Sequence, residues 1–282
     1  MITPAEVAAA GQLACLLEVS APKPGNVSPD RHFHDTRYED FLASAVAIGP
    51  ALAAADRHPL GVTIRSAVDA TLRWTRSNTN LGIVLLLAPL ARAALKSGGG
   101  LRERVSRVLE ETTVEDAAEV YAAIRRARPG GLGEAAAEDV AESPSVPLRQ
   151  AMALAAERDA IAREYVTDFA LTFDTGVSAL RAARQEGLAW TDAAVDCYLA
   201  LLDTADDTHI ARKLGAAEAA RVSQRARQIR VAGGTRSAEG RAGLAMLDAE
   251  LRDSRNRRNP GTTADLTCAA LFVVILEGDW DR

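Results

Sequence analysis

Apolar residues recur every three or four positions along most of the chain, the spacing that places them on one face of an α-helix. Thr3-Pro4-Ala5-Glu6 is a capping box with proline at the first helical position, and it begins a helix expected to end near Glu18. Further helices are expected over residues 38–54, 62–76, 101–111, 114–127, 148–165, 166–186, 191–213, 216–232, 237–255 and 264–276, with a central helix behind residue 81. The pattern predicts an all-α fold, a single multi-helix bundle spanning residues 1–282 with buried central helices.

The central stretch joins four short polar side chains, Ser77-Asn78-Thr79-Asn80, to an uncharged run from Leu81 to Ala91. A helix that is apolar on every face is a buried core helix. Its polar opening would then lie inside the protein, where first-turn amides and the helix dipole favour an anion. The alternative is a capped core helix with no ligand. Pro89 removes the hydrogen bond that its position would donate to Leu85, so we expect a kink or a break there.

Composition narrows the class of protein. Hydrophobic residues make up 48% of the chain and charged residues 25%, as in ordinary globular proteins, while aromatic residues are only 4%. The net charge of −5 argues against a nucleic-acid partner. No apolar run reaches the ~18 residues of a membrane span, and the start lacks a secretory signal, so we expect a cytoplasmic protein with no membrane partner. The three cysteines lie in apolar helical patterns and are expected to be buried and reduced: Cys15, Cys197 and Cys268.

Residues 129–147 differ from their surroundings. Glycines come first, then an acidic run that includes Glu134 and Glu138, then two prolines. Few large apolar residues could anchor this segment, so we expect a mobile loop, with a role as an active-site lid left open.

Two short segments near the N-terminus could carry chemistry. Lys23, Gly25 and Asn26 join a cation to a loop whose glycine allows close approach of backbone to a ligand, so they are candidate phosphate contacts; a surface turn is the alternative. His32 and His34, flanked by carboxylates, are candidates for acid–base catalysis or metal binding, and a solvated polar loop is the alternative.

An acidic cluster follows later in the chain. Asp203, Asp206 and Asp207 would lie close together if they share one helix, and such carboxylates repel unless a cation intervenes. We therefore predict that they bind Mg²⁺, with a solvated acidic face as the alternative. His209 follows as a candidate acid, and Arg212 and Lys213 as candidate phosphate contacts.

Near the C-terminus, Gly261 and Thr262 form a glycine turn with a hydroxyl cap before an apolar helix, and Asp265 lies one turn into it. Gly261 and Thr262 are candidate nucleotide contacts. Asp265 is either a capping acid or a functional carboxylate, and we favour function because the first turn of so apolar a helix would be partly buried.

Taken in order, these motifs resemble those of the triphosphoribosyl-dephospho-CoA synthase family: Lys23-Pro24-Gly25, Asn78-Thr79 with Gly82, Asp207-Thr208, and Pro260-Gly261 with Ala264-Asp265-Leu266. The resemblance covers most of the chain and implies an all-helical transferase that moves the triphosphoribosyl group of ATP to a hydroxyl of 3′-dephospho-CoA and releases adenine. Lyase-associated members usually read Asn-Thr-His-Lys/Arg-Gly, where this chain reads Asn78-Thr79-Asn80-Leu81-Gly82. The pattern is more similar to the archaeal and methylotroph branch.

This resemblance implies roles for the candidate residues. Asp207 and Asp265 would be the catalytic carboxylates, one of them shared with Mg²⁺, and a histidine (His32, His34 or His209) would be the acid. Lys23, Arg212, Lys213 and the amides behind Asn78, Thr79 and Asn80 would hold the triphosphate. These elements are expected to surround one cleft, with small-molecule nucleotides as partners and a homodimer left open. Two alternatives are a phosphoribosyl-type transferase or nucleosidase acting on another nucleotide in pterin-cofactor assembly, and a non-catalytic nucleotide-binding helical module.

Overall fold

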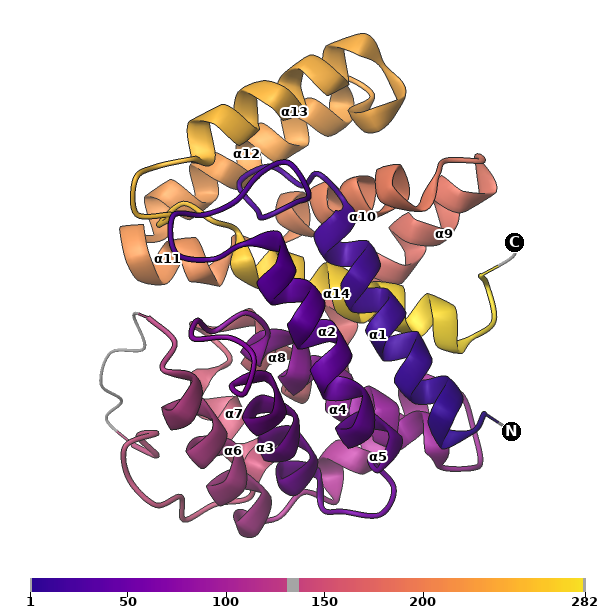
Figure 1. Cartoon of the computed structure of the whole chain (residues 1–282), viewed down its shortest axis with the longest axis vertical. Coiled ribbons are helices and arrows are strands. Elements are labelled where there is room, and N and C mark those ends of the chain that lie inside the picture. Colours follow the sequence, from indigo (N-terminus) through magenta and orange to yellow (C-terminus); the bar gives the residue numbers. More distant parts are fainter. Residues whose placement is uncertain (1, 131–136, 281–282) are drawn as a thin grey trace. The chain divides into compact units, whose positions relative to one another are not determined.

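The structure, a computed structural model, describes residues 2–130 and 137–280, and within them every regular element is helical (Figure 1). The all-α prediction is confirmed. The chain divides into two compact units, each of which is described by itself. Unit 1 comprises Met1–Leu13 and Asp40–Ala170, and unit 2 comprises Ala14–Glu39 and Leu171–Arg282. No helix in the described residues is both long and apolar enough to cross a membrane.

Unit 1 is built around one apolar helix. Its helices are the first part of α1 (Pro4–Ser20), α2 (Tyr38–Ala53, apart from its first two residues), α3 (Leu60–Thr71), α4 (Leu81–Leu95), α5 (Leu101–Glu110), α6 (Val114–Ala127), α7 (Leu148–Ala155) and α8 (Ala160–Val166). Nearly all of α4 is buried, as its uncharged sequence predicts. The α3 helix packs closely on α6. At that contact Gly61 has no side chain, because a Cβ there would lie 2.5 Å from the Asp116 carbonyl oxygen.

Pro89 does not break α4, which continues from Leu81 to Leu95. Proline has no amide hydrogen, so it cannot donate to the carbonyl of Leu85, four residues earlier. The hydroxyl of Tyr165, a fully buried residue of α8, donates to that carbonyl at 2.6 Å. A side chain from another helix therefore replaces the bond that proline removes, which makes an unbroken helix compatible with the sequence.

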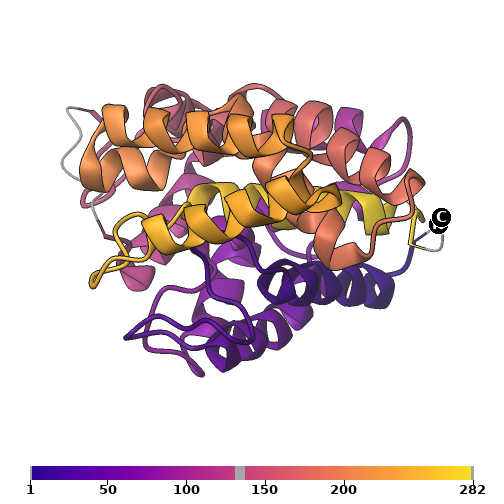
Figure 2. The ribbon, with the colours of Figure 1, turned by 90° about the horizontal axis from the view of Figure 1, so that it is seen from above.

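Unit 2 contains the end of α1 and the helices that follow residue 170: a π-helix η1 (Leu171–Val177), α9 (Ser178–Gln185), α10 (Trp190–Thr204), α11 (Thr208–Leu214), α12 (Ala216–Val231), a 3₁₀ turn η2 (Gly234–Arg236), α13 (Ala238–Leu251) and α14 (Gly261–Leu276). The α12 and α13 helices lie side by side in both views (Figures 1 and 2). Together with α10 and α11 they enclose one apolar cluster, which includes Tyr198, Leu202, Val222 and Leu251. The α14 helix is buried over most of its length.

Three helices expected from the sequence are divided. The segments 148–165 and 166–186 become α7, α8, η1 and α9. Asp159 begins α8 as its N-cap, and the chain turns again before η1 at Asp168 and Phe169, both with positive φ. The segment 191–213 ends at Thr204 and restarts at Thr208, with Ala205 extended between them. Glu164 in α8 is completely buried. Within residues 129–147, positions 131–136 lie outside the described residues, and the described part includes a hydrogen bond from the Ser145 amide to the Glu138 carboxylate at 2.9 Å.

Candidate functional site

In unit 2 the loop after α1 is held by a buried ion pair. The Lys23 ammonium lies 2.9 Å from a carboxylate oxygen of Glu18, and both side chains are almost completely buried. The same ammonium donates to the Glu18 backbone carbonyl and, at 3.2 Å, to the Ala21 carbonyl. An ammonium has three protons, and these acceptors account for all of them. Lys23 therefore fixes the loop in this conformation, and its predicted phosphate contact stays a prediction that this geometry does not favour.

The same loop is tied to α10 and α13. The Gly25 amide donates to an Asp248 carboxylate oxygen at 2.8 Å, and Tyr198 donates its hydroxyl to the Pro24 carbonyl at 2.8 Å. Arg252 donates to the Asn26 carbonyl at 2.8 Å. Gly25 has φ +77°, and a Cβ there would lie 2.9 Å from the Leu251 side chain and 3.0 Å from Pro260. Only glycine satisfies both the conformation and the contact.

Asp207 joins the openings of α11 and α14. One oxygen of its carboxylate accepts the Ile210 amide at 3.0 Å and caps α11. The other accepts the amide of Thr263 at 2.8 Å and its hydroxyl at 2.7 Å. Thr208 donates to the Thr262 hydroxyl at 3.1 Å alongside. Burial raises the pKa of Asp207, and the hydrogen bonds from Thr263 oppose that rise.

His209 lies at the junction between these two helices. A Cβ on Gly261 would be 3.1 Å from its Nδ1, so the glycine allows the imidazole to lie against the backbone. Burial, reinforced by Lys213 and Arg212, lowers the pKa of His209 to about 3. Its Nε2 atom is buried and has no hydrogen-bond partner among the described residues. The imidazole is therefore neutral at pH 7, which disfavours a charged general acid but leaves a polar atom for a ligand.

Two further charged residues of α11 and α14 are Lys213 and Asp265. Burial lowers the pKa of Lys213, with Arg212 contributing, while Asp253, Asp35 and Asp207 act in the opposite direction. Asp265 is half-buried in the second turn of α14. Burial raises the pKa of the Cys268 thiol, and the charge of Asp265 adds to that rise.

Asp203 and Asp207 do not share a helical face, which corrects the sequence-based expectation. The α10 helix ends at Thr204, and Asp207 caps the next helix, because an aspartate oxygen suits the free amides of a first turn. Asp203 pairs with Arg227 at 2.7 Å and with Arg230.

Asp206 in turn accepts the Ser223 hydroxyl at 2.7 Å. Within residues 2–130 and 137–280 no group of three histidine, cysteine or acidic side chains could hold a metal ion. The three aspartates are thus engaged by different partners and do not form a shared site, and the Mg²⁺ requirement stays a prediction.

His32 and His34 lie in the exposed loop before α2. His32 accepts the Tyr38 amide through Nδ1 at 3.1 Å, and His34 lies 2.9 Å from the Asn256 amide nitrogen. The His34 side chain is 60% exposed. All four residues belong to unit 2.

The three cysteines are buried and free, as predicted. The sulfur atoms of Cys15 and Cys268 lie 3.6 Å apart.

The opening of α4 belongs to unit 1. Asn78 accepts the Leu81 amide through its side chain at 3.0 Å. Thr79 and Ser44 share a hydrogen bond between their hydroxyls. Asn80 occupies the N-cap position, but its side chain makes no capping bond and donates to the Thr71 hydroxyl at 3.1 Å. Because the Asn80 side chain makes no capping bond, it leaves the first-turn amides of α4 available to other acceptors. An anion-binding helix opening requires such amides.

A sequence model of the ATP:dephospho-CoA triphosphoribosyl transferase family matches residues 4–282. The chain belongs to this family. Residues of three of the motifs that resemble this family meet in unit 2: Gly25 lies against Pro260, and Thr208 donates to Thr262, which follows Gly261.

Individual proteins similar to this chain carry names that agree with its family. The chain is similar to a Stutzerimonas stutzeri protein assigned as a 2-(5″-triphosphoribosyl)-3′-dephosphocoenzyme-A synthase, with 32% identity over 105 residues, or 37% of this chain and 36% of that protein. A Klebsiella pneumoniae synthase of the same name is 34% identical over 94 residues, 33% of each chain. The matched segment thus spans about a third of these curated relatives. A solved structure from Archaeoglobus fulgidus, assigned as a triphosphoribosyl-dephospho-CoA synthase, has a TM-score of 0.65 at 28% identity and covers 84% of this chain and 99% of that one.

Several structural partners of the motifs were missed by the sequence analysis: Glu18, Tyr198, Asp248, Arg252 and Thr263. One signal was available for Glu18. It lies in the last turn of α1, where the helix dipole disfavours negative charge, so a buried acid there requires a cation. Partners of Gly25 more than 200 residues away had no local signal.

Proposed function

We propose that the chain transfers the triphosphoribosyl group of ATP to a hydroxyl of 3′-dephospho-CoA or a related acceptor, and releases adenine. Membership of the family over residues 4–282 supports this activity. The structural observation that carries the proposal is the assembly made by Asp207. It holds the openings of α11 and α14 together, with His209 against Gly261. Asp265 lies in the second turn of the same α14 helix.

The reaction breaks the bond between the ribose C1 and the adenine nitrogen and forms a bond from C1 to the acceptor oxygen. The acceptor hydroxyl loses a proton and the departing adenine gains one. An oxocarbenium-like transition state is favoured by a nearby carboxylate. We assign that carboxylate to Asp265, which can remove the hydroxyl proton. Neutral His209 would hold a substrate group through its buried Nε2 rather than act as a charged acid.

Asp207 is assigned a positioning role. Its carboxylate already accepts three hydrogen bonds from Ile210 and Thr263, and these fix the two helix openings. Arg212 and Lys213 of α11 supply positive charge for phosphates, and an anion would relieve the cost of burying Lys213. In unit 1, the amides at the opening of α4 offer a second place for an anion. No step is assigned to Mg²⁺.

The test is incubation of the protein with ATP and dephospho-CoA, with and without Mg²⁺, and quantification of free adenine. Asp265→Asn should reduce kcat by more than about 100-fold, the usual contribution of a general base, with little change in stability. Asp207→Asn should reduce activity and also lower the unfolding midpoint. Asp203→Asn, which disturbs only a pair with Arg227 and Arg230, is the matched control. Full activity of Asp265→Asn would refute the assignment.

A second candidate is a phosphoribosyl-type transferase or nucleosidase acting on another nucleotide. It is favoured by Asn80 and Leu81, which stand where lyase-associated members of the family usually carry a histidine and a basic residue. Adenine release without dephospho-CoA, or release of a base from another nucleotide, would select this candidate. Tight ATP binding without turnover on any acceptor would instead select a non-catalytic nucleotide-binding module.

A further inference from the structure

Two buried thiols lie against each other in unit 2. The sulfur atoms of Cys15, in the second half of α1, and Cys268, in α14, are 3.6 Å apart, and the Cys268 thiol donates its hydrogen to the Cys15 sulfur. Cys15 is 5% exposed and Cys268 is completely buried. Both thiols are free, and the activity proposed above uses neither of them.

This contact needs only a small change to become a disulfide bond. Bonded sulfur atoms lie about 2.0 Å apart, so the two side chains have to approach by about 1.5 Å. The third cysteine has a different environment, because the Cys197 thiol of α10 donates to the Gly176 carbonyl at 3.4 Å. Cys197 is equally buried and therefore serves as an internal control.

The two thiols differ in how easily they react. Burial raises the pKa of the Cys268 thiol, and Cys15, Glu18 and Asp265 add to that rise. Glu18 follows Cys15 by three residues and Asp265 precedes Cys268 by three, so each carboxylate shares a helical face with its cysteine. A thiolate is therefore disfavoured at Cys268. Cys15, the slightly exposed member, is the sulfur that an oxidant meets first.

A bond between these sulfurs would join the two separate segments of unit 2. Cys15 belongs to residues 14–39 and Cys268 to residues 171–282, and the two cysteines are 253 positions apart. A cross-link that closes so long a loop removes conformational freedom from the unfolded chain, so it favours the folded state.

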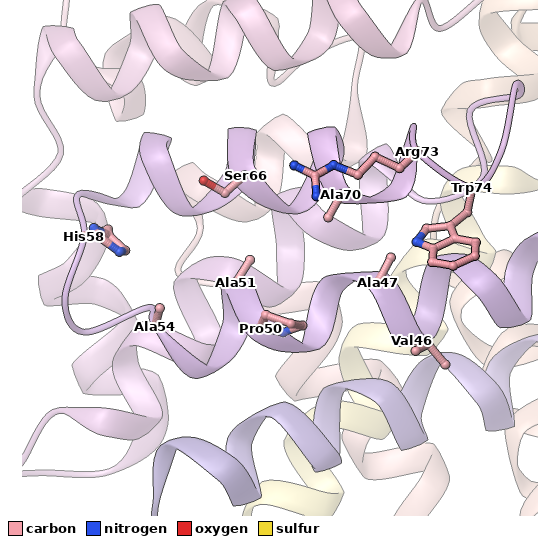
Figure 3. Close-up of a pocket in the computed structure, with 10 residues that line it drawn as sticks. All are labelled: Val46, Ala47, Pro50, Ala51, Ala54, His58, Ser66, Ala70, Arg73 and Trp74. Atoms are coloured by element: carbon pink, nitrogen blue, oxygen red, sulfur yellow. The ribbon is translucent and has the colours of Figure 1, made fainter.

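The exposed hollow between α2 and α3 in unit 1 offers no such chemistry (Figure 3). Its lining includes Arg73, Trp74 and His58, and most of its other described side chains are small. No thiol is among the described residues that line it, so a bond of this kind cannot form there.

We propose that Cys15 and Cys268 are a modification site, at which a peroxide oxidises the two thiols to a reversible disulfide that ties α1 to α14. The Cys15 sulfur loses its proton and attacks one peroxide oxygen; the O–O bond breaks, and the departing hydroxide takes up a proton to become water. The Cys268 sulfur then attacks the resulting sulfenic sulfur, forms the S–S bond and releases a second water. Two thiols lose two electrons in total, and one peroxide gains them.

The test is treatment of the full-length protein with hydrogen peroxide, followed by blocking of free thiols in denaturant and peptide mapping by mass spectrometry. The expected product is a pair of linked peptides that contain Cys15 and Cys268, lighter by two hydrogen atoms, with Cys197 still free. Dithiothreitol should restore all three thiols. The thermal unfolding midpoint of the oxidised protein should lie at least about 5 °C above that of the reduced protein.

Three variants assign the change. Cys15→Ala and Cys268→Ala each remove one partner, and Cys197→Ala is the matched control. Peroxide should form the cross-link in Cys197→Ala and in neither of the other two, whose unfolding midpoints should not rise on oxidation. In Cys268→Ala the Cys15 sulfur should instead be recovered as its sulfenic or sulfinic acid, which identifies it as the sulfur attacked first.

Three results would overturn the inference. One is that all thiols stay free in the folded protein while the same treatment in urea oxidises them, because the pair would then be out of reach of the oxidant. Another is a cross-link that involves Cys197 or a second molecule. The third is a bond between Cys15 and Cys268 that lowers the unfolding midpoint, because such a bond would strain unit 2 rather than tie it together. None of these readouts depends on adenine release, so failure of the proposed function would leave them unchanged.

Discussion

Replacing Tyr165 by phenylalanine tests how unit 1 accommodates a proline inside its central helix. The substitution removes one hydroxyl and keeps the ring, which is fully buried and lies 6.2 Å from the ring of Phe169 between centroids. The Leu85 carbonyl then loses the donor that replaces the missing amide of Pro89. Leaving a buried acceptor without a partner costs about 1–3 kcal/mol, so we expect Tyr165→Phe to lower the free energy of unfolding by about 2 kcal/mol.

A second substitution separates this effect from a general loss of packing. In Pro89→Ala the amide hydrogen returns and can donate to the Leu85 carbonyl within α4. Tyr165→Phe should therefore cost less in that background, about 1 kcal/mol or below, and the double-mutant cycle should give a coupling energy of about 1 kcal/mol. Pro89→Ala removes buried ring atoms, but that loss cancels in the cycle.

The measurement is urea unfolding of the four proteins followed by far-ultraviolet circular dichroism, with hydrogen exchange of the α4 peptides to locate the effect. Faster exchange confined to the turn between Leu85 and Pro89 in Tyr165→Phe is the expected pattern. An equal cost of Tyr165→Phe with proline or alanine at position 89 would refute the reasoning, because the hydroxyl would then stabilise the fold independently of the missing amide.

Three further substitutions follow from the packing and charges. Lys23→Met leaves the carboxylate of Glu18 buried without its cation, so chemical unfolding should show a free energy of unfolding lower by about 3–5 kcal/mol. Adding Glu18→Gln should recover much of this loss, and no recovery would contradict the buried ion pair. Gly61→Ala forces a methyl group against the Asp116 backbone and should cost about 1–3 kcal/mol. Alanine at Gly100, which has no neighbour within 4 Å but is the N-cap of α5, should cost less, below about 1 kcal/mol. The pKa of His209 is lowered to about 3, so the unfolded chain binds a proton that the folded chain excludes as the pH falls from about 6.5 toward 3, and stability falls with it. His209→Gln should reduce the loss of stability between pH 7 and pH 5 by up to about 2 kcal/mol, and an unchanged pH dependence would show that the imidazole is not desolvated.

The sequence was informative where a signal is local. The apolar run behind Asn80 predicted a buried helix, and α4 is one. Gly25 was expected to allow a close approach of the backbone in a loop, and it has positive φ and lies against Leu251 and Pro260; the approach to a ligand stays a prediction. The break considered at Pro89 was wrong, because Tyr165, far along the chain, donates to the Leu85 carbonyl and α4 continues.

The prediction that Asp203 and Asp207 lie close together on one helix was wrong for a different reason. An i,i+4 pair shares a face only if the helix continues, and aspartate also begins helices. Periodicity alone could not distinguish these cases, since the residues around 205 fit either pattern. The arginines that pair with Asp203 lie on α12, more than 20 residues later, and no local pattern connects them.

Unit 2 is assembled from two segments far apart in the sequence, residues 14–39 and 171–282. During synthesis the segment with Lys23 leaves the ribosome long before Asp248 and Pro260, the groups against which its glycine packs. The intervening 131 residues can pack with residues 1–13 as unit 1 before the partners of that segment have been synthesised. A nascent chain halted before α14 would therefore carry a formed first unit and an unfinished second one, so loss of the last helix removes the whole junction at Asp207 rather than only its own residues.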